Sequence, residues 1–321
     1  MTARVLMIVL ALALVATPAA AQKTAASPPA APPVAPLKAG PTAGPATGPG
    51  PARSILFVGN SFTFGALSPV RRYRADTVTD LNKNGIGGVP ALFKRFADQA
   101  GLSYAVSLEA VSGMGLDYHF TQKRPLIDKA WDVVILQDFS TLDRAKPGDP
   151  GLHRRYAAQL AKMFAARNSG ADIELSATWS RADLTYKPGS PWSGQTIDRM
   201  AIDLRRAADQ ARAGAPQIRG VIPIGEAWNR AIAAGLADPN PYDGTSFGQI
   251  DLWTYDQYHA SAYGYYLEAL LIFGRVTGLD PRSLGVGELA ADDLGLAPGV
   301  TLALQRLAYE QLASEAARPR R

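Results

Sequence analysis

The sequence predicts a single α/β domain in which a mainly parallel β-sheet lies between two layers of helices. Short apolar runs typical of buried strands alternate along the chain with longer segments whose apolar residues recur at helical spacing. The order of these elements, β, α, β, β, α, β, α, β, α, is typical of a parallel sheet with crossover connections on both faces. Residues 53–321 are numerous enough to form one such domain with a sizeable core.

Five segments are expected to be the strands. They combine aliphatic or β-branched residues with a turn signal or a polar residue at the end, and they are residues 54–58, 104–111, 133–136, 173–178 and 219–223. The run 133–136 is apolar throughout, which indicates a central strand that is buried on both faces.

Helices are expected between and after these strands, where apolar residues fall on one helical face. The segments are 90–100, 149–167, 195–214, a helix that begins at Gly225, 263–276 and 301–313. Pro90 at the first position of its helix and Gly101 behind the last are the usual boundary signals. Loops are expected at 66–88, 179–194 and 238–248, which are rich in turn residues.

The first 21 residues are expected to be a secretory signal peptide. Arg4 precedes the apolar run 5–15, which is too short to span a bilayer, and small alanines at 19–21 suit signal peptidase. Residues 22–52 are rich in Ala, Pro and Gly and carry two lysines as their only charges, which predicts a disordered tether. We therefore expect an exported protein, periplasmic or secreted, that is not transmembrane once the signal is removed.

Charge and cysteine content exclude two classes of protein. Subtracting Arg4, Lys23 and Lys38, which precede the domain, leaves 30 basic residues against 28 acidic ones. The basic clusters that remain are short and scattered, whereas a nucleic-acid-binding surface needs a concentrated stripe, so no nucleic-acid partner is expected. The chain has no cysteine, so it is not a disulfide-stapled scaffold and depends on its core for stability.

Ser61 is a candidate nucleophile. It follows the strand 54–58 directly after the turn pair Gly59-Asn60, and ligands of open α/β sheets bind at the carboxyl ends of the strands. A plain connecting turn has the same composition, so the assignment of a nucleophile also requires a candidate general base. His259 is that candidate, since Asp256 lies three residues before it and is able to orient the imidazole as in a serine triad.

These residues resemble the conserved blocks of the SGNH/GDSL hydrolase superfamily. Gly59-Asn60-Ser61 is similar to its nucleophile block, Asp256-x-x-His259 to its last block, and Gly113 to its glycine block. The resemblance covers about residues 54–277 and implies a flavodoxin-like sheet in a three-layer α/β/α domain. It also implies that the backbone N–H groups of Ser61 and Gly113 bind an oxyanion.

The third block of the superfamily, Gly-x-Asn-Asp, is absent. Gln137-Asp138 follows the strand 133–136 in its place, so the resemblance implies that the Gln137 amide is the side-chain oxyanion donor. The alternative is that Gln137 satisfies backbone groups where the strand ends. The chain is therefore expected to belong to a divergent branch of the superfamily.

Other side chains admit two interpretations each. His119 is either a second base or a partner in a local hydrogen bond, and His153, beside two arginines, is expected to be solvated. Three aromatic residues of the loop 179–194, namely Trp179, Tyr186 and Trp192, either line a substrate groove or pack over the loop itself. A metal site at Asp256 and His259 would lack two further ligands at sensible spacing.

The function expected from the resemblance is that of an exported serine esterase. It would cleave acyl esters, including acyl groups on glycans, through an acyl-serine intermediate formed on Ser61, and this chemistry requires no metal or organic cofactor. The expected partner is a small-molecule or glycan ester. The alternative is a non-catalytic protein of the same fold that binds carbohydrate or the cell envelope.

Overall fold

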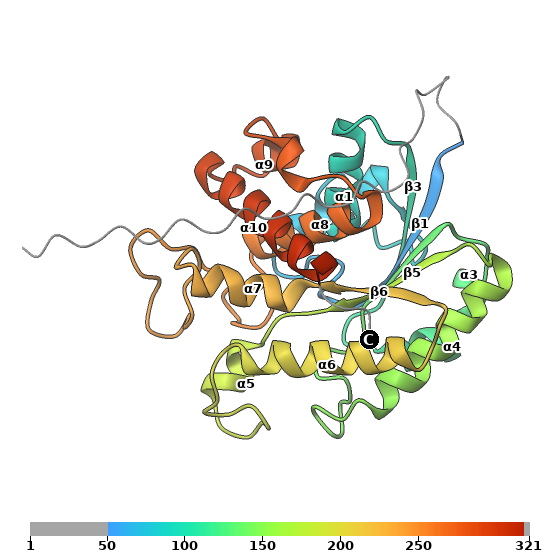
Figure 1. Cartoon of the computed structure of the whole chain (residues 1–321), viewed down its shortest axis with the longest axis horizontal. Coiled ribbons are helices and arrows are strands. Elements are labelled where there is room, and N and C mark those ends of the chain that lie inside the picture. Colours follow the sequence, from blue (N-terminus) through green and yellow to red (C-terminus); the bar gives the residue numbers. More distant parts are fainter. Residues whose placement is uncertain (1–50, 318–321) are drawn as a thin grey trace, which may run out of the picture. The chain divides into compact units, whose positions relative to one another are not determined.

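A computed structural model describes residues 51–317 (Figure 1). The expected signal peptide, and the expected tether as far as residue 50, lie outside the described residues. Six parallel strands form one sheet: β1 (Arg53–Gly59), β2 (Thr79–Asp80), β3 (Tyr104–Ala110), β4 (Val133–Leu136), β5 (Asp172–Ala177) and β6 (Ile218–Pro223). Their spatial order is β2-β3-β1-β4-β5-β6. Without the two-residue β2, this is the flavodoxin-like order, so the predicted fold class is confirmed.

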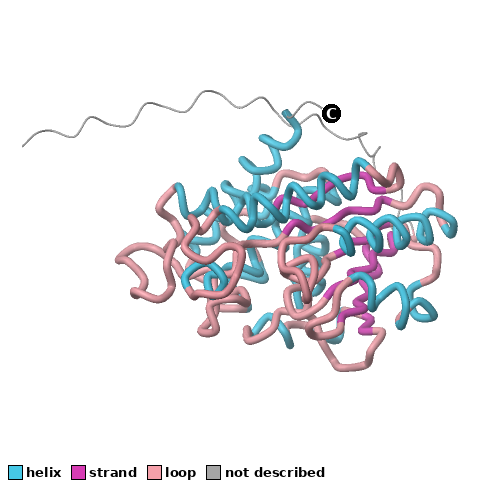
Figure 2. The backbone as a smooth tube through the Cα atoms, turned by 90° about the horizontal axis from the view of Figure 1, so that it is seen from below, coloured by secondary structure: helices cyan, strands magenta, loops and turns pink. Residues whose placement is uncertain are grey.

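Helices cover both faces of the sheet (Figure 1). One face carries α1 (Gly88–Gln99), α7 (Ile224–Ala233), α8 (Ala262–Thr277), α9 (Leu289–Asp293) and α10 (Pro298–Ala317). The other carries α2 (Leu116–Gln122), α3 (Arg124–Ile127), α4 (Gly151–Arg167) and α6 (Arg199–Ala213). A view turned by 90° shows the strands enclosed between these helices (Figure 2).

The core follows from the alternation of side chains along the central strands. In β1, Ile55 and Phe57 belong to the apolar cluster on the side of α8, whereas Leu56 and Val58 belong to the cluster on the side of α4. All four side chains are completely buried. Successive residues of β1 point to opposite faces of the sheet, and both faces are buried. Every position from 55 to 58 is therefore apolar, whereas a strand with one exposed face would alternate apolar and polar residues.

Several short elements differ from the sequence expectation. The predicted loop 66–88 contains two 3₁₀ turns, Pro69–Arg72 and Ala75–Thr77, and the edge strand β2. The predicted loop 179–194 contains α5 (Ala182–Tyr186), and α6 begins at Arg199, later than expected. These elements are too short for hydrophobic periodicity to distinguish them from irregular chain.

α8 is the most buried helix that packs on the sheet, with twelve of its sixteen residues buried. Ser261 caps its N-terminus by accepting from the N–H of Gly264, and Gly278, with φ of 72°, ends it in the left-handed conformation. In the described part of the chain, none of the helices combines the length and the apolarity that a membrane crossing requires. The segment that contains Asp256 and His259 leads directly into this rigid helix.

Candidate active site

The turn after β1 is held by the side chain of Asn60. Its Oδ1 accepts from the N–H of Phe62 at 3.1 Å, and its Nδ2 donates to the carbonyls of Met114 at 2.9 Å and Asp138 at 3.1 Å. Because Met114 follows β3 and Asp138 follows β4, one amide joins three loops at the carboxyl edge of the sheet. Ser61, the next residue, is presented at this edge with 4% of its surface exposed.

Gln137, the first residue after β4, forms hydrogen bonds to the same turn. Its Oε1 accepts from the N–H of Asn60 and from the hydroxyl of Thr63, both at 3.0 Å, and its Nε2 donates to the carbonyl of Asp138. The orientation of the amide is fixed, because the N–H of Asn60 requires an acceptor. Gly59 lies against this arrangement, since a Cβ there would stand 2.8 Å from the Gln137 Oε1.

These contacts fit the second role expected for Gln137, which is to satisfy backbone groups where the strand ends. Both ends of its amide are engaged by the turn, and the side chain is 1% exposed. The expectation that Gln137 donates to an oxyanion is therefore not supported by its geometry, because its N–H₂ group is directed at a neighbouring carbonyl. The glutamine instead satisfies the groups that are exposed where β4 ends.

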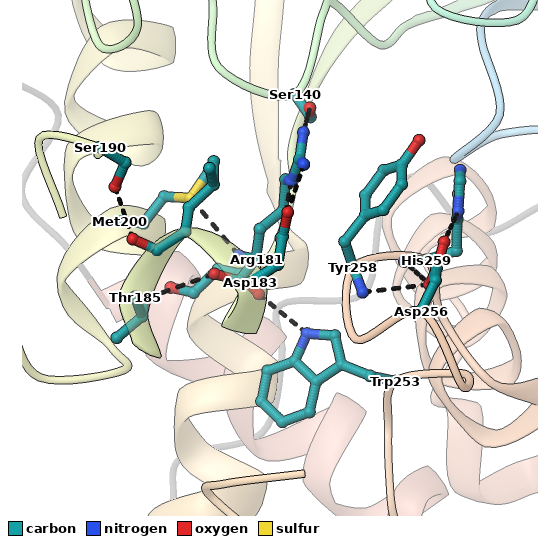
Figure 3. Close-up of polar contacts among 12 residues, drawn as sticks. Ser140, Arg181, Asp183, Thr185, Ser190, Met200, Trp253, Asp256, Tyr258 and His259 are labelled. Atoms are coloured by element: carbon teal, nitrogen blue, oxygen red, sulfur yellow. Dashed lines mark hydrogen bonds and ion pairs between the residues drawn. The ribbon is translucent and has the colours of Figure 1, made fainter. Parts of the chain in front are cut away.

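His259 is oriented by Asp256. The imidazole Nδ1 lies 2.6 Å from Asp256 Oδ2, while Oδ1 of the same carboxylate accepts from the N–H groups of Tyr258 and His259 at 3.1 and 3.0 Å (Figure 3). Gln257, between them, adopts φ of 56°, which turns the chain back on itself. The Nε2 of His259 is buried and has no hydrogen-bond partner within the described chain.

The structure brings the His259 segment against the Ser61 turn. The ring centroids of Phe62 and His259 are 5.6 Å apart, and those of Tyr258 and His259 are 3.7 Å apart. From α8, the hydroxyl of Tyr265 donates to the carbonyl of Ser61 at 3.2 Å. The segment of His259 thus packs on the turn of Ser61, nearly 200 positions away in the chain, through the ring of Phe62.

Burial sets the protonation of His259. Burial lowers the pKa of its imidazole below the ordinary value, and the hydrogen bond and negative charge of Asp256 oppose that shift. The positive charge of Arg181 lowers the pKa further. The imidazole is therefore neutral at neutral pH, the state in which Nε2 is able to accept a proton.

Gly113 lies in a turn and adopts the left-handed backbone conformation that favours glycine, with φ of 67°. Its carbonyl accepts from the Arg144 guanidinium, which leaves the N–H as the free polar group of this residue. Among the hydrogen bonds of the described residues, none uses the N–H of Gly113 or of Ser61 as donor. Both are positions at which the resemblance implied an oxyanion donor.

Asp138 and His153 form a second carboxylate–imidazole pair near the site. His153 Nδ1 lies 2.8 Å from Asp138 Oδ2, and Oδ1 accepts from the N–H of Leu116 and Phe139. The expectation that His153 is solvated is wrong, since 3% of its surface is exposed. The pair positions the start of α2, which follows the glycine turn.

His119 forms a third such pair. Its Nδ1 contacts Glu109 of β3, and both side chains are completely buried. Asn82 donates to the second oxygen of Glu109 at 3.1 Å, and Lys123 in turn donates to Asn82. The structure therefore favours the local structural role of His119 over that of a second base. In the described chain, no three His, Asp or Glu side chains gather in a way that could hold a metal ion.

The aromatic residues of the loop 179–194 mostly pack inward. Trp179 is completely buried, its ring stacks on Phe62 at 4.4 Å and on Trp228 at 4.7 Å, and Trp192 is 2% exposed. Tyr186, at 41% exposed, donates its hydroxyl to the Pro239 carbonyl. Of the two interpretations, packing therefore holds for Trp179 and Trp192, and neither is accessible to a substrate ring.

Comparison with known proteins gives likenesses of fold. No protein-family model matches the chain, and no curated protein matches it. A DUF4886 family protein from Bacteroides uniformis is 18% identical, with 84% of this chain and 97% of that chain covered and a TM-score of 0.59. This likeness shows that the two chains share a fold.

Two further similar solved structures have GDSL in their names. A putative GDSL-like lipase from Parabacteroides merdae is 18% identical, with 70% of this chain and 95% of that chain covered and a TM-score of 0.49. A member of the lipolytic protein G-D-S-L family from Veillonella parvula is 13% identical, with 71% of this chain and 100% of that chain covered and a TM-score of 0.45. In this chain, Ser61 follows β1, Gly113 follows β3 and His259 precedes α8.

The packing of Trp179 has a measurable consequence for stability. Trp179→Ala should lower the free energy of unfolding by about 3–5 kcal/mol, because a completely buried indole is removed from between two rings. Tyr186→Ala, in the same loop but exposed, should change it by less than about 1 kcal/mol. Urea unfolding followed by tryptophan fluorescence and circular dichroism measures both, and equal effects would contradict the buried stack.

The lowered pKa of His259 predicts the pH dependence of any activity that uses it as a base. Protonation removes the base, so kcat/KM should stay constant through neutral pH and fall only below about pH 6.5, the ordinary imidazole value. Asp256→Asn should move this limb to still lower pH, because the carboxylate stabilises the imidazolium, and should lower kcat by roughly 10²- to 10⁴-fold. A limb that moved upward in this variant would contradict the assignment.

Proposed function

We propose that the protein is a serine hydrolase that cleaves acyl esters through Ser61, His259 and Asp256. One observation carries the proposal: His259 is held at Nδ1 by a carboxylate at 2.6 Å, its buried Nε2 has no partner among the described residues, and its ring packs on Phe62, the neighbour of Ser61. An imidazole oriented at one nitrogen and unengaged at the other is the arrangement of a general base beside a nucleophile.

The reaction uses groups of this chain alone. His259 Nε2 takes the proton of the Ser61 hydroxyl as Oγ attacks the acyl carbonyl carbon, and a tetrahedral intermediate forms. Its collapse breaks the bond to the alkoxy oxygen, which leaves as an alcohol with the proton from His259. Water then attacks the acyl-serine, gives a proton to His259, and the acid departs as Ser61 regains that proton.

The negative charge that develops on the carbonyl oxygen needs donors that are already in place. The N–H groups of Ser61 and Gly113 are unengaged and belong to neighbouring turns, so we assign them to the oxyanion. Asp256 holds the imidazole in one orientation and stabilises its positive charge during transfer. Gln137 contributes indirectly, because its amide fixes the backbone of the turn that presents Ser61.

The substrate we propose is an acyl ester, with O-acyl groups on glycans as one class and simple soluble esters as the other. The burial of Trp179 and Trp192 removes two of the three aromatic side chains that would have favoured a sugar. A panel of p-nitrophenyl esters of increasing chain length and an O-acetylated oligosaccharide separates these classes by kcat/KM.

Replacing the nucleophile tests the proposal. Ser61→Ala and His259→Ala should each lower ester hydrolysis by at least about 10⁴-fold, and the double variant should be little worse, because the residues of a triad act as a unit. Tyr255→Phe is the control, since it changes an exposed side chain of the segment that carries His259 and should retain most of the activity. Hydrolysis by Ser61→Ala at the wild-type rate would contradict the proposal and favour a non-catalytic binding protein.

We also propose that the protein is exported by its first 21 residues, on the grounds of their sequence alone. Expression of the full chain should then yield a periplasmic or secreted form that begins at Gln22. Cell fractionation with N-terminal sequencing checks this. A protein that stays in the cytoplasm with its first residues intact would contradict export while leaving the esterase proposal untouched.

A further inference from the structure

Residues 179–183, in the loop after β5, are hydrogen-bonded to residues 253–258, the segment that leads to His259. Two indole N–H groups and one backbone N–H make these bonds, at 3.0, 3.0 and 3.2 Å, from Trp179 to the Tyr258 carbonyl, from Trp253 to the Ser180 carbonyl and from Asp183 to the Gln257 carbonyl. The position of the His259 segment therefore depends on the loop after β5 as well as on α8.

Arg181, in the same loop, lies against the ring of Tyr258. Its guanidinium carbon is 4.0 Å from the centroid of that ring, and the centroid of the His259 ring is 3.7 Å from the same point. Figure 3 shows Arg181 and Tyr258 extended side by side, with His259 on the far flank of the tyrosine. The tyrosine ring thus lies between a positive charge and the imidazole, and the charge is within about 8 Å of the imidazole.

Arg181 is fixed by three hydrogen bonds of its own. Its Nε and Nη2 donate to the two carboxylate oxygens of Asp183 at 3.0 and 2.6 Å, and its Nη1 donates to the hydroxyl of Ser140 at 3.2 Å. Because Ser140 lies in the loop after β4, the guanidinium joins the loops after β4 and β5 to the His259 segment. Two parallel bonds to one carboxylate also fix the plane of the guanidinium. The face of Tyr258 that is turned away from His259 is therefore covered by a planar group that is held in place.

We propose that Arg181 is a positioning residue for His259 and acts on it through the ring of Tyr258. This rests on the proposed function of His259 as the general base. The guanidinium covers one face of the tyrosine ring, and the tyrosine ring in turn packs against the imidazole. Together with the bond from Nδ1 to Asp256, this packing holds the imidazole in one orientation, so that Nε2 keeps its direction.

The charge of Arg181 gives this role a signature in the pH dependence. The titratable side chains of the site come from three elements, and they are Asp256 and Tyr258 beside His259, Arg181 and Asp183 of the loop after β5, and Tyr265 of α8. The turn after β1 packs on the imidazole through Phe62, which has no charge. Burial lowers the pKa of His259 and Asp256 raises it, whereas of the two loop residues Arg181 lowers it and Asp183 raises it. Loss of the Arg181 charge should therefore favour the imidazolium and move the pKa of His259 upward.

Arg181→Gln tests the proposal because it removes the charge and the planar fork and keeps a polar side chain. At about pH 8, where His259 is neutral in both proteins, we expect kcat to fall about 10-fold with KM changed by less than about threefold, since a misplaced base affects the transition state more than substrate binding. The acid limb of kcat/KM should move upward by about half a pH unit, the effect of one charge at about 8 Å in a partly hydrated site. Arg181→Lys, which keeps the charge without the fork, should retain the wild-type limb.

The same shift is measurable without a substrate. The chain has three histidines, so NMR of the imidazole protons gives three titrations, and His259→Ala assigns the signal of His259. In Arg181→Gln this titration should move upward, and those of His119 and His153 should stay where they are in the wild type.

Arg282 provides a matched control in another part of the domain. It donates to both carboxylate oxygens of Asp280, two residues away in the sequence, and its guanidinium carbon lies 3.5 Å from the centroid of the Tyr309 ring. Arg282→Gln therefore removes the same two kinds of interaction at a site without a histidine. It should match the wild type in kcat, in KM, in the acid limb and in the titration of His259.

The outcomes separate this role from simple support of the loop and from failure of the proposed function. An unmoved acid limb and an unmoved His259 titration in Arg181→Gln would overturn the proposal whatever its kcat. Should that variant fail to fold, Asp183→Asn replaces it: both quantities should then move downward, and no shift in either would overturn the proposal. A wild type that neither hydrolyses esters nor is labelled at Ser61 by a fluorophosphonate would overturn the proposed function, and the action of Arg181 on His259 would then be decided by the NMR titration alone.

Discussion

The hydrogen bonds of the Asn60 side chain are the constraint on which the site depends. β1, β3 and β4 are neighbours in the sheet, and each ends at the same edge, but parallel pairing alone does not fix the loops beyond the last pair. Asn60 Nδ2 donates to carbonyls in both neighbouring loops, and Asn60 Oδ1 closes its own turn. Removing this amide would leave buried carbonyls unsatisfied at the point where Ser61 is presented.

The three histidines show why a local pair of residues does not identify a base. Each has a carboxylate at Nδ1 and a buried Nε2 without a partner in the described chain. His119 lies under the glycine turn and His153 at the start of α4, whereas His259 lies against the Ser61 turn. The environment around the second nitrogen, and not the carboxylate, distinguishes the proposed base.

Sequence patterns predicted the fold, which the structure confirms, and also indicated the candidate site residues, because both depend on local signals. The central strands are apolar on two faces, and Gly59-Asn60-Ser61 and Asp256-x-x-His259 are short enough to recognise in one sequence. The role of Gln137 could not be assigned this way, because the direction of its amide depends on contacts with Asn60 and Thr63, which are distant in the sequence. β2 consists of only two residues and has no periodicity to detect.

His153 is different, because a signal for its burial was present. It stands four residues before Ala157, seven before Leu160 and eleven before Phe164, on the stripe that faces the core. The neighbouring arginines suggested solvent, but on a helix, neighbours in sequence point to different faces. Position on the helical face outweighs local composition at such a site.

The burial of α8 connects the stability of the domain to the geometry of the site. Tyr265, in the second turn of this helix, is completely buried and donates its hydroxyl toward the carbonyls of Ser61 and Ala66, at 3.2 and 3.3 Å. The segment that carries Asp256 and His259 precedes the same helix. The Ser61 turn and His259 are therefore both attached to α8, one by a hydrogen bond and the other by the chain itself. Packing of α8 against the sheet and α1 therefore fixes the Ser61 backbone and the start of the His259 segment together. Any shift of this helix would move both partners, which is why the two halves of the site, far apart in the sequence, are able to keep a common geometry.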